Sequence, residues 1–247
     1  MSPVRLSIIV PCYNEEKNIP LVLENFNRAL AGREGVELLL VDNGSRDGTG
    51  KVIDAEIISQ ECNFARKVIV PQNQGYGFGI LSGLKEARGE VLAWTHADLQ
   101  TDPEDVLKAY HCYLEKACGH DKILVKGHRQ NRKPAEKLFS FGMQVFSSMM
   151  LGAWLEEINA QPKLFPRKLY ENMRNPPQDF SLDLYLLYWA KKMGYKIVSI
   201  PVYFKERLYG EAKGGGGSGF RPRWKLIQRT FRYVCDLSQK ARKGGLN

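Results

Sequence analysis

Polar and acidic side chains follow three short apolar runs in the first half of the sequence. Residues 6–10 lead into a segment with Tyr13 and Glu15, residues 36–41 into Asp42-Asn43, and residues 91–95 into His96-Ala97-Asp98-Leu99-Gln100. A tyrosine ring can stack on a base, and carboxylates can accept hydrogen bonds from base or ribose or hold a divalent ion against a diphosphate. These residue types indicate a nucleoside diphosphate site.

Each of these segments also has a structural interpretation when taken alone. Residues 43–48 could form only a turn, and Asp102 could only cap a helix that begins at Pro103. Their shared position after successive apolar runs favours a binding site, because ligands of open parallel sheets bind beyond the carboxyl ends of the strands.

Apolar runs and helical stretches alternate along the first half of the chain. Strands are expected at 6–10, 36–41, 67–70, 91–95 and 123–125, with helices at 19–31, 50–59, 75–87 and 103–116 between them. The second half adds a helix over 181–193 and a strand over 196–200. This order predicts an α/β fold with a mostly parallel central sheet and helices on both faces.

The domain organisation expected from this pattern is one catalytic domain over residues 1–220 with a tail. Residues 1–127 would form the nucleotide-binding half, residues 128–220 the acceptor half, and residues 221–247 a basic amphipathic helix. The glycines at 75, 77, 79 and 83 do not follow the GxGxxG pattern of dinucleotide sites. They are expected to allow close helix–sheet packing or contact between a helix end and phosphate.

Composition limits the classes of binding partner and the cellular compartment that are expected for this protein. The net charge of +9 implies phosphates, anionic lipid headgroups or nucleic acid. The five scattered cysteines lack CxxC spacing and are expected to be reduced thiols of a cytoplasmic protein. No signal peptide is expected, because the apolar run 6–10 is too short and ends at Pro11. The uncharged run 138–155 contains too many polar residues and glycines for a membrane span, which needs about 20 mostly apolar residues, so no integral membrane segment is predicted.

The motifs at the predicted strand ends resemble those of the family-2 glycosyltransferases. They are Pro11-x-Tyr13-Asn14-Glu15-Glu16, Val41-Asp42-Asn43-Gly44-Ser45-x-Asp47-Gly48-Thr49, Asn73-x-Gly75 and Ala97-Asp98-Leu99-Gln100. The segment Arg207-x-x-Gly210-x-x-Lys213 is similar to the phosphate-binding segment of the dolichyl-phosphate mannose synthase and polyprenyl-phosphate glycosyltransferase branch. The resemblance covers nearly the whole chain and implies the A-type glycosyltransferase fold.

The resemblance also implies roles for single residues. Asp98 and Gln100, with His96 as a possible third ligand, would approach a Mg²⁺ or Mn²⁺ ion on the diphosphate. Arg207 and Lys213 would contact the diphosphate or the acceptor phosphate. The nucleotide sugar would be bound by Pro11, Tyr13, Glu15, Asp42, Asn43, Ala97, Asp98, Gln100 and Arg129.

Three positions depart from the family pattern. Asn43 stands where an Asp is usual, which changes the donors and acceptors offered to the base. His96 replaces the first Asp of the acidic metal-binding motif, and imidazole suits Mn²⁺ better than Mg²⁺. Ala212 replaces the Ser that usually precedes the lysine of the later motif, which removes a hydroxyl donor.

The activity that follows is inverting transfer of a hexose from a GDP- or UDP-linked donor to a polyprenyl phosphate. The alternative acceptor is a hydroxyl of a growing surface glycan or glycolipid, which would need a general base. Asp183, with Asp179 behind it, is the candidate, although Asp183 could also only favour the dipole at a helix N-terminus. A phosphate acceptor would need no base.

Two other classes of protein remain as remote alternatives. A nucleotidyltransferase usually carries a Gly/Arg/Lys-rich loop after its first strand, where this chain has acidic residues. A nucleic-acid-binding module would explain the charge, but no binding signature is present, so no nucleic acid partner is expected. The tail combines basic residues with Trp224, Ile227 and Phe231 and predicts peripheral contact with the cytoplasmic membrane face. The alternative is a helix packed on the protein's own core.

Overall fold

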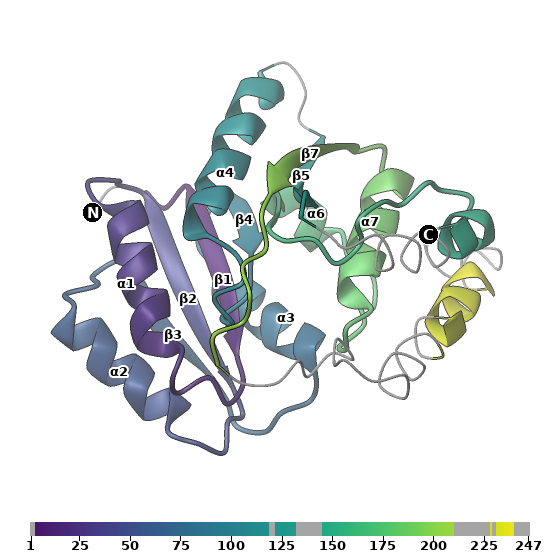
Figure 1. Ribbon diagram of the computed structural model, residues 1–247. Helices are drawn as coiled ribbons and strands as arrows, with labels where there is room; N and C mark the ends of the chain where they lie inside the picture. The colour runs from purple at the N-terminus through teal and green to yellow at the C-terminus, as the bar shows by residue number, and fades with distance from the viewer. Residues whose placement is uncertain (1–2, 119–121, 132–144, 210–227, 229–230, 240–247) are drawn as a thin grey trace.

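A computed structural model describes residues 3–118, 122–131, 145–209, 228 and 231–239. Its centre is a seven-stranded sheet with the order β3-β2-β1-β4-β6-β5-β7 (Figure 1). The strands are β1 (Leu6–Cys12), β2 (Val36–Asn43), β3 (Ala65–Val70), β4 (Val91–Trp94), β5 (Ile123–Arg129), β6 (Lys163–Pro166) and β7 (Lys196–Val202). The helices are α1 (Ile19–Leu30), α2 (Thr49–Ser59), α3 (Tyr76–Glu86), α4 (Pro103–Ala117), α6 (Arg167–Glu171) and α7 (Leu182–Lys192).

Alternating side chains of the sheet enter two separate cores, one under each layer of helices. Leu6, Ile8 and Val10 of β1 pack with α1, α2 and α4, whereas Ile9 packs on the opposite face with α3 and α7. Because both faces are covered, these strands are apolar along their whole length, which is typical of parallel strands. The predicted α/β fold with helices on both faces is confirmed.

Strand β6 was not predicted, and it is the one strand in this sheet that runs antiparallel to its neighbours. It pairs with β4 on one side and β5 on the other, where Lys163 is in register with Trp94, the last residue of β4, and with Lys126 in the middle of β5. Its four residues begin with a lysine and end with a proline, so they show neither alternation nor an apolar run.

The glycines of α3 allow close packing, as the sequence analysis proposed. A Cβ at Gly83 would lie 2.6 Å from the Ile9 side chain, and one at Gly77 would lie 2.7 Å from the Asp179 carbonyl oxygen. Helix α3 therefore sits directly on the sheet and on the loop before α7. All five cysteines are free thiols.

The predicted boundaries at residues 127 and 220 stay predictions. Of the predicted tail helix, residues 231–239 are helical, while Trp224 and Ile227 lie outside the described residues. Among the residues that the structure describes, none of the helices combines the length and apolar character needed to cross a bilayer.

Candidate functional site

The loops after β1 and β2 are joined by hydrogen bonds at the carboxyl edge of the sheet. The Asn14 N–H donates to Ser45 Oγ (3.1 Å), the Glu15 N–H donates to Thr49 Oγ1 (2.8 Å), and the Arg46 N–H donates to Asn14 Oδ1 (2.8 Å). Since β1 and β2 are parallel neighbours, this edge also brings their predicted nucleotide-binding residues together.

Four of those residues are half-buried, as a binding surface requires. Pro11, the next-to-last residue of β1, is in register with Val41, and Tyr13 comes directly after the strand. Glu15 Oε2 accepts a hydrogen bond from Asn18 Nδ2 (2.5 Å), and Asp42 Oδ1 accepts one from the Ser45 N–H (3.1 Å). Both carboxylates are therefore positioned by hydrogen bonds made within these two loops.

Asn43 has a structural role that explains why this chain lacks the usual Asp. Its side chain is only 2% exposed, and its Nδ2 donates to the Gly75 carbonyl oxygen (2.9 Å) at the start of α3. The Asn73 side chain in turn donates to the Asn43 carbonyl oxygen (2.9 Å). A carboxylate at position 43 could not donate to Gly75, so the amide is required by this packing.

The loop after β4 carries the predicted metal-binding residues. Asp98 is 6% exposed, its Oδ1 accepts a hydrogen bond from the Gln100 N–H (3.1 Å), and its Oδ2 lies 3.8 Å from His96 Nδ1. His96 Nδ1 is buried without a hydrogen-bond partner among the described residues. Ala97, between the two, is also buried.

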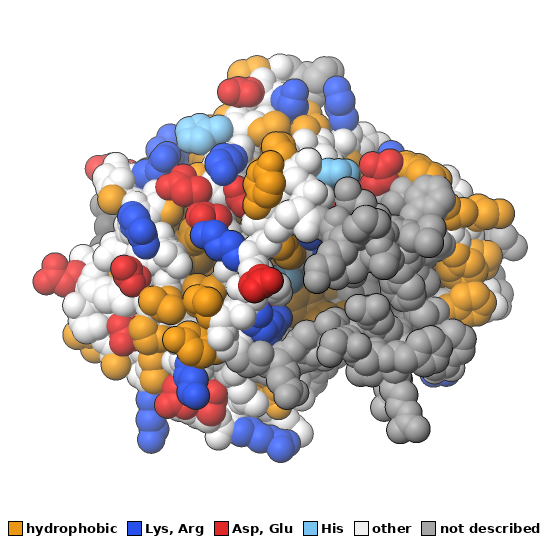
Figure 2. All heavy atoms as spheres, in the orientation of Figure 1, with side chains coloured by type: hydrophobic (Ala, Val, Ile, Leu, Met, Phe, Trp, Pro, Cys, Tyr) orange, Lys and Arg blue, Asp and Glu red, His pale blue; other side chains and the backbone are white. Residues whose placement is uncertain are grey.

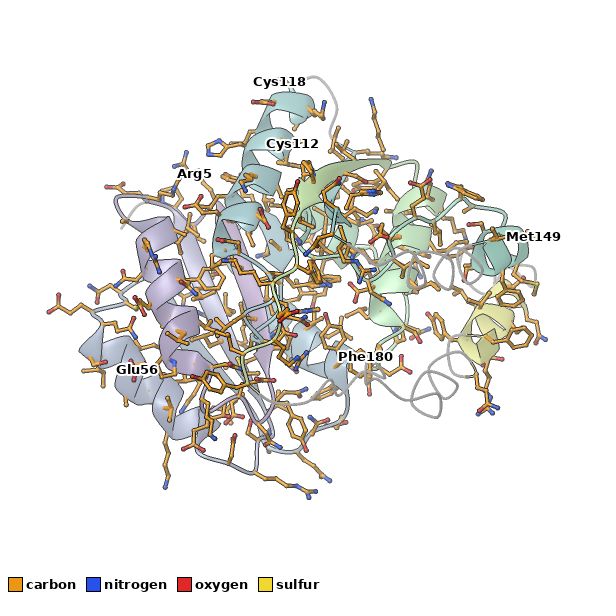
Figure 3. All side chains as sticks on the ribbon, viewed as in Figure 1. Arg5, Glu56, Cys112, Cys118, Met149 and Phe180 are labelled. Atoms are coloured by element: carbon orange, nitrogen blue, oxygen red, sulfur yellow. The ribbon has the colours of Figure 1, made fainter. Side chains whose placement is uncertain are left out.

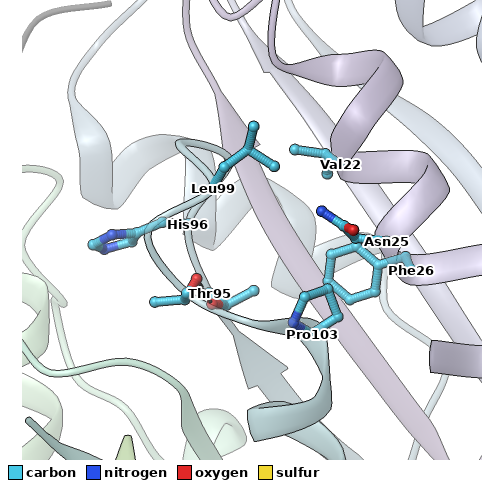
Figure 4. Close-up of a pocket in the computed structure, with 8 residues that line it drawn as sticks. Val22, Asn25, Phe26, Thr95, His96, Leu99 and Pro103 are labelled. Carbon is cyan, nitrogen blue, oxygen red and sulfur yellow. Dashed lines mark hydrogen bonds between the residues drawn. The ribbon is translucent and has the colours of Figure 1, made fainter. Parts of the chain in front are cut away.

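A small hollow lies behind this loop, on the α1 side. It is lined by Val22, Phe26, Leu99 and Pro103 among others, and the His96 ring is directed away from α1 (Figure 4). The Thr95 and Thr101 hydroxyls, which also line it, are hydrogen-bonded to each other (2.8 Å). The hollow therefore belongs to the packing that supports the loop, and Asp98 is not among the residues that line it.

Residues 203–207, which we call the crossing segment, connect β7 to the loop after β4. They lead from the end of β7 to the loop after β4, although β5 and β6 lie between β7 and β4 in the sheet (Figure 1). Phe204 exchanges hydrogen bonds with the Asn131 side chain (3.1 and 2.6 Å), and Lys205 does so with Gln100 (2.9 and 3.3 Å). The Lys205 ammonium also lies 3.0 Å from Asp102, the N-cap residue of α4.

The crossing segment places Arg207 directly on Asp98. Arg207 Nη2 lies 2.6 Å from Asp98 Oδ2 and 3.4 Å from Gln100 Oε1. Asp98 was predicted to bind a metal ion on the diphosphate and Arg207 to contact the diphosphate or the acceptor phosphate, and the structure brings the two side chains together. Lys213, the other cation of that motif, lies outside the described residues.

Arg129 lies at the end of β5 with two partners other than Asp98. Its Nε donates to Glu157 Oε2 (2.8 Å), and its guanidinium group lies over the Phe204 ring, 5.4 Å from the ring centre. Arg129 thus packs against the crossing segment through the Phe204 ring. Its contact with a phosphate stays a prediction.

Asp183 lies in the first turn of α7, and three buried donors from other parts of the chain hold its carboxylate. Its Oδ1 accepts hydrogen bonds from Trp94 Nε1 (3.2 Å) and Gln161 Nε2 (3.0 Å) and lies 3.3 Å from Lys163 Nζ. No described residue donates to its Oδ2. Asp179 instead accepts from the Ser181 N–H (2.8 Å) just before the helix. The carboxylate of Asp183 is therefore fixed in orientation through one oxygen.

Two buried lysines lie beside each other on neighbouring strands, and one of them, Lys163, contacts Asp183. Lys163 is fully buried, and burial lowers its pKa although Asp183 acts in the opposite direction. Lys126 is 2% exposed, and burial, followed by the charge of Lys163, lowers its pKa to about 7. Sequence analysis did not find either lysine, because a lysine within a strand gives no signal of its burial.

Tyr76 is a further site residue that the sequence analysis did not identify. Its ring stacks on Phe180 at 4.8 Å and meets His96 edge to face at 6.1 Å, and its hydroxyl accepts from Gln161 Nε2 (3.4 Å). Burial raises the pKa of Tyr76 well above its ordinary value, and the charges of Asp183 and Asp98 raise it further. Tyr76 therefore lies between the two carboxylates and keeps its proton.

The side chains around Asp98 fit a divalent ion only as an incomplete set of ligands. Within the described part of the chain, no three His, Cys, Asp or Glu side chains gather at one point. Asp98 Oδ2 and the Nδ1 of His96 offer two ligand atoms. Because Arg207 Nη2 contacts the same Asp98 oxygen at 2.6 Å, an ion bound there would share that oxygen with Arg207 or displace it. Mg²⁺ and similar ions are commonly bound by one or two carboxylates together with substrate phosphates and water, so this arrangement fits an ion shared with a diphosphate.

Comparison with known proteins identifies a family and individual relatives that match most of this chain. Residues 7–181 match the family described as glycosyl transferase family 2. An undecaprenyl-phosphate 4-deoxy-4-formamido-L-arabinose transferase from Proteus mirabilis is 26% identical over 85% of this chain, and the match spans 62% of that relative's length. A dolichyl-phosphate beta-glucosyltransferase from Dictyostelium discoideum is 23% identical over 95% of this chain and 76% of its own.

Solved structures share the fold. Glucosyl-3-phosphoglycerate synthase from Mycobacterium tuberculosis, in complex with Mn²⁺, UDP and phosphoglyceric acid, has a TM-score of 0.70 at 19% identity, covering 94% of this chain and 78% of its own. A mannosyltransferase from Pyrobaculum calidifontis, in complex with GDP-mannose and Mn²⁺, has a TM-score of 0.64 at 18% identity, covering 98% and 76%. The family match covers well over half of the chain, and the chain therefore belongs to glycosyl transferase family 2.

Proposed function

We propose that this protein transfers a hexose from a UDP- or GDP-linked donor to a polyprenyl phosphate, with inversion at the anomeric carbon. The observation that carries the proposal is the 2.6 Å contact between Arg207 and Asp98. It joins a carboxylate suited to a metal-bound diphosphate with a cation suited to a phosphate, at the edge of the sheet where ligands bind. The names of the Proteus and Dictyostelium relatives support a polyprenyl phosphate as the acceptor.

The donor would lie across the loops after β1, β2 and β4. Tyr13, Glu15 and Asp42 would bind the base and ribose, and Asp98 would face the diphosphate. Mg²⁺ or Mn²⁺ held by Asp98 and His96, with Gln100 nearby, would stabilise negative charge on the leaving diphosphate. Arg207 would add a positive charge at the same place, because its guanidinium group already lies against Asp98.

The alternative acceptor, a sugar hydroxyl, is supported by the arrangement of Asp183. A general base needs a fixed orientation and an oxygen that is available, and three donors hold Asp183 through Oδ1 alone. A polyprenyl phosphate is already ionised near neutral pH, so its transfer would proceed without this base. Transfer to a sugar hydroxyl would therefore require Asp183 as a base, whereas transfer to a polyprenyl phosphate would not.

A transfer assay with a short polyprenyl phosphate and with oligosaccharide acceptors tests the proposal. Glycolipid formation that is lost in Arg207→Ala and in Lys213→Ala, but not in Lys122→Ala at the start of β5, would support the phosphate acceptor. Transfer to sugar hydroxyls alone, with dependence on Asp183, would overturn it in favour of the alternative.

We also propose that the reaction takes place at the cytoplasmic face of a membrane, with the enzyme attached peripherally. The free thiols and the basic C-terminal segment support this location.

A further inference from the structure

Two helical segments from distant parts of the sequence pack together at one end of the molecule. They are residues 145–151 and residues 231–239 (Figure 1). The rings of Phe146 and Phe231 stack at 4.5 Å, and Ser238 Oγ donates to the Met150 carbonyl oxygen (2.8 Å). Val234 and Leu237 are buried. These apolar residues of the tail pack on the protein itself, as the alternative interpretation of the tail expected.

Three large apolar side chains remain exposed on and beside this pair of helical segments. Met149 is 79% exposed, Trp154 is 50% exposed and Phe231 is 49% exposed. We call these three residues the apolar tip. Hydrophobic side chains gather at this edge of the molecule (Figure 2), and Met149 lies at its margin (Figure 3). Single exposed apolar residues are common, but a group of large ones at one end marks an interaction surface.

The positive charge of the protein is concentrated in the sequence next to the apolar tip. Residues 221–247 contain eight Lys and Arg residues and one acidic residue, Asp236, so they carry most of the net charge of +9. A partner for this end of the molecule must therefore accept apolar side chains and also attract cations. An anionic lipid surface does both, since its hydrocarbon boundary accepts Trp, Phe and Met and its headgroups attract Lys and Arg.

We propose that the apolar tip inserts into an anionic membrane surface and orients the enzyme on it. The function of this membrane contact rests on the proposed lipid-phosphate acceptor. The tail then contributes charge and Phe231, instead of lying on the membrane as a separate amphipathic helix. The Trp154 indole N–H donates to the Glu156 carboxylate, so its polar edge has a partner when the ring lies at the depth of the headgroup region.

Flotation with vesicles of phosphatidylcholine and phosphatidylglycerol, without any sugar donor, tests the proposal. Met149→Ser and Phe231→Ser should each weaken partitioning by about tenfold, because each removes one large apolar side chain from the lipid. Ile58→Ser is the matched control, since Ile58 on α2 is 77% exposed outside the apolar tip. Met149 makes the decisive variant, because it is the most exposed of the three and its side chain makes no hydrogen bond or ring contact with the described residues.

Fluorescence gives a second measurement in which the three residues of the apolar tip stay unchanged. In a Trp224→Phe background, brominated phospholipids should quench Trp154, whereas the buried Trp94 and Trp189 should stay unquenched. Equal binding of wild type and Met149→Ser, an equal loss in Ile58→Ser, or an unquenched Trp154 on bound vesicles would overturn the proposal. Transfer to a short polyprenyl phosphate in detergent is measured separately, so loss of the activity and loss of the membrane contact can be told apart.

Discussion

Replacing Lys126 with methionine should stabilise the protein near neutral pH and reduce the pH dependence of its stability. Lys126 lies on β5, 2% exposed, beside Lys163 of β6 in the sheet register. Burial and the neighbouring positive charge lower the Lys126 pKa from 10.5 to about 7. Methionine keeps most of the side-chain length and removes the charge, so the packing of β5 is largely preserved.

The sign follows from the proton count of the two states. Between about pH 7 and the ordinary lysine pKa of 10.5, the unfolded chain binds a proton that the folded protein does not, so stability rises with pH. Below about pH 7 the ammonium is charged in both states. Its burial then destabilises the folded state by the full free energy that corresponds to the difference between the two pKa values. At about 1.36 kcal/mol per pH unit, the gap between these pKa values corresponds to roughly 5 kcal/mol.

Urea unfolding at about pH 7 and about pH 10 measures this contribution. The difference in free energy of unfolding between Lys126→Met and wild type should be several kcal/mol at the lower pH and should nearly vanish at the higher one. Lys51→Met, at an exposed position of α2, is the control and should change neither value. A wild-type stability that does not rise with pH relative to the variant would refute the assignment of a buried, destabilising ammonium.

Two further predictions concern residues where the chain departs from the family pattern. Asn43→Asp replaces a buried donor to the Gly75 carbonyl oxygen by a carboxylate, and should lower the free energy of unfolding by about 1–3 kcal/mol in urea denaturation; an unchanged value would show that this hydrogen bond is dispensable. Mn²⁺ should support turnover at least as well as Mg²⁺, because His96 offers an imidazole nitrogen beside Asp98. A strong preference for Mg²⁺ in a metal titration would count against His96 as a ligand.

Much of the fold follows from features that can be read along the chain. Buried parallel strands such as β1 and β2 are short apolar runs, and the helices between them carry caps or apolar spacing that can be recognised. Strand β6 could not be predicted in this way, because its pairing comes entirely from its neighbours β4 and β5. The burial of Lys163 is a consequence of that pairing and of Asp183 above it.

The placement of the loops after β1, β2 and β4 at one edge of the sheet could be predicted from the sequence, whereas the contacts between distant side chains could not. Asp98 and Arg207 are 109 positions apart, and their contact depends on the path of the crossing segment over the sheet edge. Tyr76 gave no signal because its importance comes from lying between Asp98 and Asp183, which belong to different elements. The contact of Asn43 with the base stays a prediction, while its hydrogen bond to the Gly75 carbonyl oxygen gave no signal in the sequence.

Release of nucleoside diphosphate from a panel of sugar nucleotides, with a short polyprenyl phosphate as acceptor, tests the central claim most directly. Wild-type protein should release UDP or GDP from at least one donor in a reaction that requires a divalent ion. Asp98→Ala should abolish that release and leave the fold intact by circular dichroism, while Asp54→Ala, on the exposed side of α2, should remain active. Normal metal-dependent release by Asp98→Ala, or no release from any donor by the wild type, would contradict the account.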